Sequence, residues 1–290
     1  LIVFKMNVNS CKRWAADFVC KISIKLYYQL SYLHNRKRLL NFAFPHNLSE
    51  FIIKKIVSGE TAQYAVYADK YAVRKYVEEV GLGNILPKIL GVWKDVDEIE
   101  FDSLPDKFAL KLNYGSGMNI ICKNRRNLNT AEIKEKISGW MSKDIFWRAE
   151  PHYDLIPKCI ICEEFIEDHM GYFPLDYKFM CFNGVPNHIL VCSERNVKMK
   201  LFTYDLDWNK IDLLTSDYRS TEDIRKPQNL DLMIQYATQL SKGFDFVRID
   251  LYDTGEHVFF GEMTFTPEGG VLRYYSLSAL SMMGKLVYLK

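Results

Sequence analysis

Two strand-like stretches near the C-terminal end of the chain show the clearest alternation of apolar and polar positions. Residues 244–252 and 258–265 are rich in aromatic and β-branched side chains, and Asp-Thr-Gly-Glu lies between them. This pattern predicts a β-hairpin. Because successive side chains of a strand point to opposite faces, each strand should present one set of residues together: Phe244, Phe246, Arg248 and Asp250 on the first, and Phe260, Glu262 and Thr264 on the second.

The connecting loop decides whether these two sets lie side by side. A three-residue loop, Thr254-Gly255-Glu256 with Gly255 in the left-handed conformation, would place Asp250 beside Glu262. A two-residue turn would send Glu262 to the other face. We therefore expect the odd-numbered loop, or a β-bulge that has the same effect.

Arg248, Asp250 and Glu262 would then form a charged cluster in an otherwise apolar hairpin. Charges in such a setting must be paired or must bind a metal, because desolvating them alone is costly. One interpretation is a structural bridge between the arginine and the carboxylates. The other is a magnesium site, since Mg²⁺ is bound by one or two carboxylates together with phosphate oxygens. The residue types favour the magnesium site.

Helical spacing of apolar residues marks several further stretches, and Asn47 and Ser49 are potential N-caps for the first. The pattern predicts helices over about 51–57, 65–80, 130–141, 230–242 and 277–289. In the second of these, Lys70 and Arg74 are one turn apart. Both side chains could therefore reach the same anion.

A short glycine-rich loop, Tyr114-Gly115-Ser116-Gly117, joins two predicted strands at 108–112 and 118–122. Lys111 lies on the polar face of the first strand, because it alternates with Leu110 and Leu112. A P-loop would carry G-K-[ST] and run into a helix. Neither feature is present, so the loop is not a P-loop.

Two other strand regions carry charged residues of interest. The strand at 158–166 ends in the acidic and apolar sequence Glu163-Glu164-Phe165-Ile166. Residues 176–182 and 185–192 predict a hairpin across the Asn183-Gly184 turn. Lys178 lies on the face opposite its two aromatic neighbours, and Arg195 closes this sheet as a candidate substrate contact.

Composition narrows the class of protein. The chain has 290 residues, enough for two modest domains or one large domain with an insertion, and its shares of 48% hydrophobic and 26% charged residues are typical of a globular protein. A net charge of +2 gives no reason to expect a nucleic-acid partner. Seven cysteines cannot all form disulfides with one another. Cys159 and Cys162 are the only two cysteines that lie close in sequence, and no second CxxC motif follows. We therefore expect buried thiols in a reducing cytoplasm. The six histidines show no ligand spacing.

The first 40 residues are strongly basic, with eight Lys or Arg against one acid, Asp17. Trp14, Phe18, Ile22 and Leu26 recur among them at helical spacing. No apolar run reaches the length of a membrane span, and the N-terminus lacks the order of regions found in a signal peptide. A basic amphipathic helix can lie on an anionic membrane surface, dock on a partner protein, or pack on the body of the protein.

The motif R-x-D on one strand, followed by G-E-x-T-x-x-P on the next, resembles the metal-binding core of the ATP-grasp superfamily. The strings F-D-F-V-R-I-D-L-Y and G-E-M-T-F-T-P are most similar to its TupA-like branch, which is associated with teichuronopeptide and other surface-polysaccharide synthesis. The resemblance covers about Leu48 to the C-terminus. It implies an α+β, ATP-grasp fold in which two antiparallel-sheet subdomains clamp ATP, with a helical N-terminal region.

The resemblance also implies a division of the chain and a role for each candidate residue. It divides the chain into 1–50 (basic, helical), 51–105 (helical and linker), 106–166 (small subdomain with a glycine-rich flap) and 167–290 (large subdomain with the metal site). The implied phosphate contacts are Lys70, Lys111 and the flap residues Gly115, Ser116 and Gly117. The implied adenine-binding hinge is Glu163, Glu164, Phe165 and Ile166. The implied ligands of two Mg²⁺ ions are Asp250 and Glu262, and the implied catalytic residues are Arg248 and Lys178.

The implied reaction is ADP-forming carboxylate–amine ligation through an acyl phosphate. The branch suggests a carboxylated sugar or glycan as one substrate and an amine or amino acid as the other, at a cytoplasmic site that includes the inner face of the membrane. Three alternatives stay open: an ATP-grasp kinase of a sugar hydroxyl, a non-catalytic nucleotide-binding module of a glycan-assembly complex, and a basic scaffold at the membrane surface.

Overall fold

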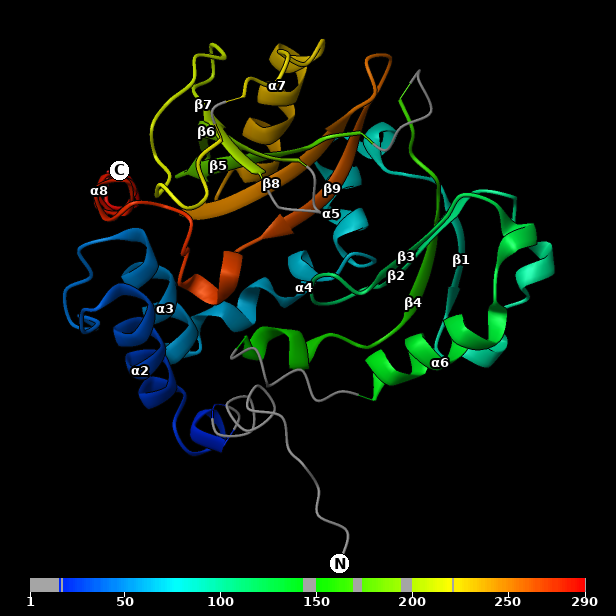
Figure 1. The fold of residues 1–290 in the computed structure, drawn as a ribbon, viewed down its shortest axis with the longest axis horizontal. Coiled ribbons are helices and arrows are strands. Elements are labelled where there is room, and N and C mark those ends of the chain that lie inside the picture. Colours follow the sequence, from blue (N-terminus) through cyan, green and yellow to red (C-terminus); the bar gives the residue numbers. More distant parts are fainter. Residues whose placement is uncertain are drawn as a thin grey trace, which may run out of the picture.

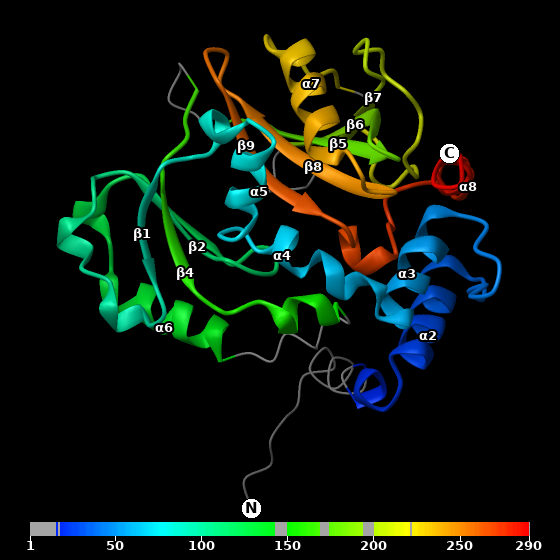
Figure 2. The same ribbon diagram turned by 180° about the vertical axis from the view of Figure 1, so that it is seen from behind.

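Two antiparallel sheets and the cavity between them organise the structure (Figures 1 and 2). The computed structural model describes residues 16, 18–142, 150–168, 174–193, 200–220 and 222–289. Trp14, Asp17 and Arg195, on which expectations were placed above, lie outside the described residues.

The smaller sheet has the strand order β1-β4-β2-β3. Its strands are β1 (Ile89–Trp93), β2 (Phe108–Leu112), β3 (Asn119–Cys122) and β4 (Ile160–Glu164). Helix α6 (Thr130–Met141) has the predicted bounds, begins at the Asn129 cap and buries Ile133 and Ile137 in the core of this sheet. The loop between β2 and β3 carries the glycine-rich sequence toward the cavity.

The larger sheet has the strand order β7-β6-β5-β8-β9. Its strands are β5 (Asp176–Phe182), β6 (Val185–Ser193), β7 (Lys200–Tyr204), β8 (Phe246–Asp253) and β9 (Val258–Thr264). One face packs on α7 (Leu230–Ser241) in an apolar core that includes Val247, Ile249 and Leu251. The other face carries the alternating residues Arg248 and Asp250 toward the cavity. The β5–β6 hairpin turns at Asn183-Gly184 as predicted, with positive φ at both residues.

Helices from both ends of the chain form a third core beside the larger sheet. They are α2 (Ile24–Arg36), α3 (Leu48–Ser58) and α8 (Leu277–Leu286). Of the two potential caps, Asn47 caps α3, since its side chain accepts from the Glu50 backbone N–H. Arg36 fastens α2 to the segment after β9 by donating to the carbonyls of Val271, Leu272 and Tyr275.

The predicted helix over 65–80 is wrong as one element. It is divided into α4 (Ala65–Ala68) and α5 (Val73–Glu79). The Asp69 side chain accepts from the backbone N–H groups of Tyr71 and Ala72, at 2.8 and 3.2 Å, and so caps a new start. Lys70 lies in the turn between the two helices rather than one turn from Arg74 on a single helix.

A β-bulge sets the register of the β8–β9 hairpin. The loop has four residues, Thr254–His257, so of the two expected arrangements the odd-numbered loop is wrong and the β-bulge is confirmed. The expected effect is achieved at Gly261, where the register shifts between Asp250 and Leu251, and Asp250 pairs with Glu262. The same shift places Phe260 opposite Leu251 in the core rather than on the face of Glu262, which corrects the face predicted for Phe260.

We expect replacement of Gly261 by alanine to weaken the fold at this bulge. An added Cβ would lie 2.9 Å from the Asp250 carbonyl oxygen and 3.0 Å from the Tyr252 ring. Overpacking of this kind costs about 1–3 kcal/mol of unfolding free energy, which urea denaturation would measure. Gly139→Ala in α6 is the matched control, because nothing lies within 4 Å of its added Cβ and alanine favours a helix by about 1 kcal/mol. Equal effects of the two substitutions would contradict the role of the bulge.

Candidate active site

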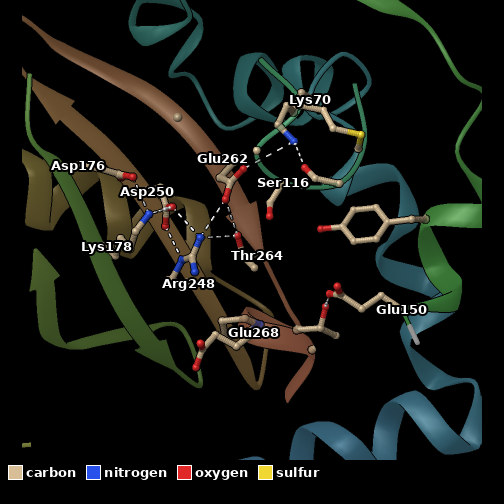
Figure 3. Close-up of a pocket in the computed structure, with 18 of the residues that line it drawn as sticks. Lys70, Ser116, Glu150, Asp176, Lys178, Arg248, Asp250, Glu262, Thr264 and Glu268 are labelled. Carbon is tan, nitrogen blue, oxygen red and sulfur yellow. Dashed lines mark hydrogen bonds and ion pairs between the residues drawn. The ribbon is translucent and has the colours of Figure 1, made fainter. Parts of the chain in front are cut away.

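A cavity of about 540 Å³ lies between the two sheets. The β2–β3 loop, strands β5, β8 and β9 and the segment after β9 line it, and helix α2 adds Tyr27 and Tyr28. Figure 3 shows basic and acidic side chains from these elements turned toward one another. The predicted residues Lys70, Lys111, Lys178, Arg248, Asp250 and Glu262 all line this cavity, together with the three flap residues.

Arg248 is the centre of the charged network. Its Nε and one terminal nitrogen donate to the two oxygens of Asp250 at 2.6 and 2.7 Å. The same terminal nitrogen donates to Glu262 Oε1 at 2.9 Å and to Thr264 Oγ1 at 3.0 Å, and Thr264 in turn donates to Glu262 at 3.1 Å. A planar guanidinium suits this arrangement, because its donors can be shared between two carboxylates in fixed directions.

Lys178 approaches Asp250 from the neighbouring strand. The two residues are cross-strand partners in the β5–β8 register, and Lys178 Nζ donates to Asp250 and, at 2.6 Å, to Asp176 Oδ2. Sequence reasoning did not single out Asp176. A signal was present, since Asp176 and Lys178 are two apart on one strand and therefore share a face.

Lys70 reaches the other carboxylate from the turn between α4 and α5. Its Nζ lies 3.7 Å from Glu262 Oε2 and donates to the carbonyl of Gly115 at 2.6 Å. Asn113, a buried residue of the β2–β3 connection, holds this turn in place, because its carbonyl accepts from the Lys70 N–H and its amide donates to Asp69. The structure therefore joins Lys70, the glycine-rich loop and strand β9 in one contact network.

Lys111 and Arg74 share a different carboxylate. Glu163 lies 2.5 Å from Lys111 Nζ and 3.6 Å from Arg74, which also donates to the carbonyl of Pro87. The expectation that Lys70 and Arg74 reach the same anion is therefore wrong, since Lys70 contacts Glu262.

The predicted adenine-binding residues lie outside the residues that line the cavity. Glu163 is a buried counter-ion of Lys111. Glu164 accepts from the backbone N–H of Lys88 at 2.8 Å. Phe165 lies under Lys107 Nζ, 5.9 Å from the ring centroid, and Ile166 is buried. Their predicted contact with adenine therefore stays a prediction.

The glycine-rich loop has the backbone conformation that its sequence suggests. Gly115 and Gly117 have φ of 67° and 74°, a region that side chains with a Cβ rarely adopt. Gly115 is buried, whereas Ser116 and Gly117 are exposed at the cavity. The loop can therefore bring backbone N–H groups close to a ligand without an intervening side chain.

The charges around Glu262 shift its pKa. Burial alone would raise the pKa of this carboxyl, but the charges of Lys70, Arg248 and Lys178 outweigh burial and lower the pKa to about 2. Burial also lowers the pKa of Lys70, and the charge of Glu262 opposes that effect. Glu262 is therefore an anion at neutral pH and available as a hard oxygen ligand.

The donor set suits Mg²⁺. Asp250 and Glu262 are adjacent across two strands on one wall of the cavity, and Mg²⁺ is commonly held by one or two carboxylates plus phosphate oxygens. Among the described residues, no group of three or more His, Cys, Asp or Glu could hold a metal by itself. A metal at this wall would thus share its coordination with a bound phosphate.

The far end of the cavity carries several residues to which sequence reasoning assigned no site role, together with Tyr153, which it considered as a surface for a sugar ring. Glu150 accepts from the Thr266 hydroxyl in a buried pair. Arg273 and Glu268 form an ion pair at 3.3 Å, and burial raises the pKa of Glu268. Tyr27, Tyr28 and Tyr153 complete this end. These residues come from three separate segments, 27–28, 150–153 and 266–273, so no local sequence motif indicates that they meet.

The cysteines and histidines considered in the sequence analysis, as far as the structure describes them, do not line the cavity. Cys159 and Cys162 are free and buried, and burial raises the pKa of the two thiols to about 11 and about 12. Burial lowers the pKa of His152 to about 4 and that of His188 to about 3. The described cysteines thus behave as the buried thiols expected from the sequence.

Comparison with models of protein families identifies the family of this chain. Residues 49–287 match the model of the TupA-like ATP-grasp family. The chain belongs to the TupA-like ATP-grasp family. The expected α+β ATP-grasp fold is confirmed, with its helices and two antiparallel sheets. A search of curated proteins finds no match.

Solved structures that align with this chain include a ligase and a synthetase, each in complex with an adenine nucleotide. An ATP complex of D-alanine–D-alanine ligase from Bacillus anthracis aligns at 14% identity with a TM-score of 0.46, covering 77% of this chain and 64% of that one. An ADP complex of N5-carboxyaminoimidazole ribonucleotide synthetase aligns at 10% identity with a TM-score of 0.45, covering 70% of this chain. The TupA-like chain spans 46% of the length of that synthetase.

Lys70→Met should change how stability depends on pH. In the wild type the pKa of Glu262 is lower when folded than the usual 4.5, so its ion pairs stabilise the fold fully above that pH and less as pH falls. Without Lys70 the folded pKa rises, and urea unfolding should show a shallower loss of stability from about pH 5 to about pH 3. Lys75→Met is the control, because Lys75 is exposed and pairs with Glu79. Parallel curves for wild type and Lys70→Met would contradict the pairing.

Proposed function

We propose that this TupA-like protein is an ADP-forming ligase that uses ATP and Mg²⁺ to join a carboxylate to an amine. The observation that carries the proposal is the cross-strand pair Asp250–Glu262, set among Arg248, Lys178 and Lys70 on one wall of the cavity. Paired acidic and basic groups of this kind suit a metal-bound phosphate chain, because the carboxylates can hold the metal and the cations can contact phosphate oxygens.

The flap supports a phosphate at the same wall. Lys70 donates to the Gly115 carbonyl, so its ammonium lies between the flap and Glu262. Lys111 approaches from the strand before the flap and lines the same cavity. A triphosphate beneath the flap would meet two ammonium groups and backbone N–H groups, which lower the energy of charge that develops on phosphate oxygens.

The proposed reaction has two steps, formation of an acyl phosphate and then of an amide. An oxygen of the substrate carboxylate attacks the γ-phosphorus, and the bond from that phosphorus to the β–γ bridging oxygen breaks to release ADP. The amine nitrogen then attacks the acyl carbon of the acyl phosphate, inorganic phosphate leaves, and the nitrogen loses one proton to solvent. Bound Mg²⁺ would neutralise charge on the phosphate oxygens.

The chain's own residues would position the reactants rather than form covalent bonds with them. Lys178 and Lys70 would offset the negative charge, and Arg248 would steady the acyl phosphate or the tetrahedral intermediate. Because these groups are already fixed by Asp176, Asp250 and Glu262, little reorganisation is needed when charge develops.

The acceptor would occupy the end of the cavity beyond the metal-site wall. Half-buried Tyr27 there offers a flat surface and a hydroxyl group for a sugar ring, and Arg273 offers a cation for a carboxylate. This lining, together with the association of the family with surface polysaccharides, supports a carboxylated sugar or glycan precursor as the acceptor and an amino acid or other amine as its partner.

Turnover assays with Glu262→Gln test the ligase proposal. Wild-type protein with ATP and Mg²⁺ should release ADP and phosphate only with both a pool of uronic-acid nucleotides and oligosaccharides and a pool of amino acids. Glu262→Gln should lower this rate by about 10²-fold or more, as loss of a group that stabilises transition-state charge commonly does. Glu256→Gln is the matched control, because Glu256 is exposed in the loop of the same hairpin.

Other outcomes would separate the alternatives. ADP formed without free phosphate and without any amine would identify a kinase of a sugar hydroxyl. ATP binding without turnover in any pool would favour a nucleotide-binding module. A turnover rate of the Glu262→Gln variant equal to that of the wild type would contradict the proposed metal site.

A further inference from the structure

Helix α2 presents a row of leucines to solvent. Leu26, Leu30 and Leu33 follow one another at helical spacing and are 46%, 49% and 42% exposed. The residues of α2 that pack on the protein are instead Tyr28 and Tyr32, each 1% exposed. Packing of the apolar stripe on the body of the protein was one of three alternatives, but the described members of that stripe, Phe18, Ile22 and Leu26, are exposed.

The exposed apolar surface continues on both sides of this row. Ile22, at the end of the helical residues before α2, is 65% exposed, and Leu39 and Phe44, after α2, are 63% and 74% exposed. Figures 1 and 2 show α2 at the edge of the molecule, away from α7 and the smaller sheet. Clustered exposure of large apolar side chains is unusual for a protein surface with no partner.

The charged residues of the segment that carries this surface, residues 18–49, all have one sign. Lys25, Lys37 and Arg38 are exposed beside the leucine row, and residues 18–49 contain no Asp or Glu. A second copy of the chain would bring like charges together across such a face. An anionic surface would complement them.

Helix α2 is also fixed relative to the cavity. Arg36 donates to the carbonyls of Val271, Leu272 and Tyr275, and Val271 lines the cavity with Tyr27 and Tyr28. The exposed leucines and the cavity thus lie on different sides of one helix, which is about 10 Å across.

We propose that the leucine row of α2 and its flanking basic residues seat the protein on an anionic phospholipid bilayer. The helix would lie in the plane of the interface, with its leucines among the acyl chains and its lysines at the headgroups. Among the described residues, none of the helices has the length and apolar run that crossing a bilayer takes. This seating would hold the acceptor end of the cavity one helix diameter from the membrane surface.

Vesicle flotation tests the membrane proposal independently of any catalysis. Wild-type protein should float with phosphatidylcholine vesicles that contain about 30 mol% phosphatidylglycerol, and raised salt should weaken this binding. The triple variant Leu26→Ser/Leu30→Ser/Leu33→Ser should lower the bound fraction at least about tenfold. Val185→Ser is the matched control, because Val185 is 62% exposed on β6, a strand remote in sequence from α2.

A second variant, which removes basic side chains instead of leucines, tests the same proposal if the triple leucine variant fails to fold. Lys25→Gln/Lys37→Gln/Arg38→Gln should reduce flotation with the anionic vesicles, whereas Lys75→Gln should not. Failure of the wild type to float, equal flotation with pure phosphatidylcholine, or undiminished binding by both α2 variants would overturn the proposal. Concentration-dependent dimerisation that the leucine substitutions abolish, seen in sedimentation experiments without lipid, would assign the surface to a second copy instead.

Discussion

The neutralisation of buried charge is the constraint on which the site depends. Three cations, Lys70, Lys178 and Arg248, and three carboxylates, Asp176, Asp250 and Glu262, lie in contact on one cavity wall (Figure 3). No member of this set could be desolvated alone without a large cost, because a buried charge must have a partner. The cluster is therefore balanced before any ligand binds, and a metal-bound phosphate would exchange one set of ionic partners for another.

The backbone around this cluster places each charged side chain within contact distance of its ionic partner. The bulge at Gly261 aligns Asp250 with Glu262, and the β5–β8 register aligns Lys178 with Asp250. The turn at Asp69 holds Lys70 against the flap through Asn113. Packing of the opposite sheet face on α7 fixes these registers, because a slip of one residue would bury the charges and expose the apolar core.

The N-terminal region completes the cavity instead of standing apart from it. Helix α2 contributes Tyr27 and Tyr28 to the lining, and Arg36 ties the helix to the segment after β9. The same helix leaves Leu26, Leu30 and Leu33 in solvent. The proposed acceptor recognition and the proposed membrane seating thus depend on one element, so a change in the position of α2 would affect both.

The sequence by itself determined the elements whose signals are local: the hairpin of Arg248 and Glu262, the Asn183-Gly184 turn, α6 and the glycine-rich loop, since alternation, turn residues and caps act over a few positions. Motif order also indicated the family. Only the tertiary structure decided that a bulge rather than an odd-numbered loop sets the hairpin register, and that the helix predicted over 65–80 is divided at Asp69. It also decided that Glu163 pairs with Lys111, and that Asp176, Glu150 and Tyr28 line one cavity. Those outcomes depend on contacts between segments far apart in the chain, which no local pattern records.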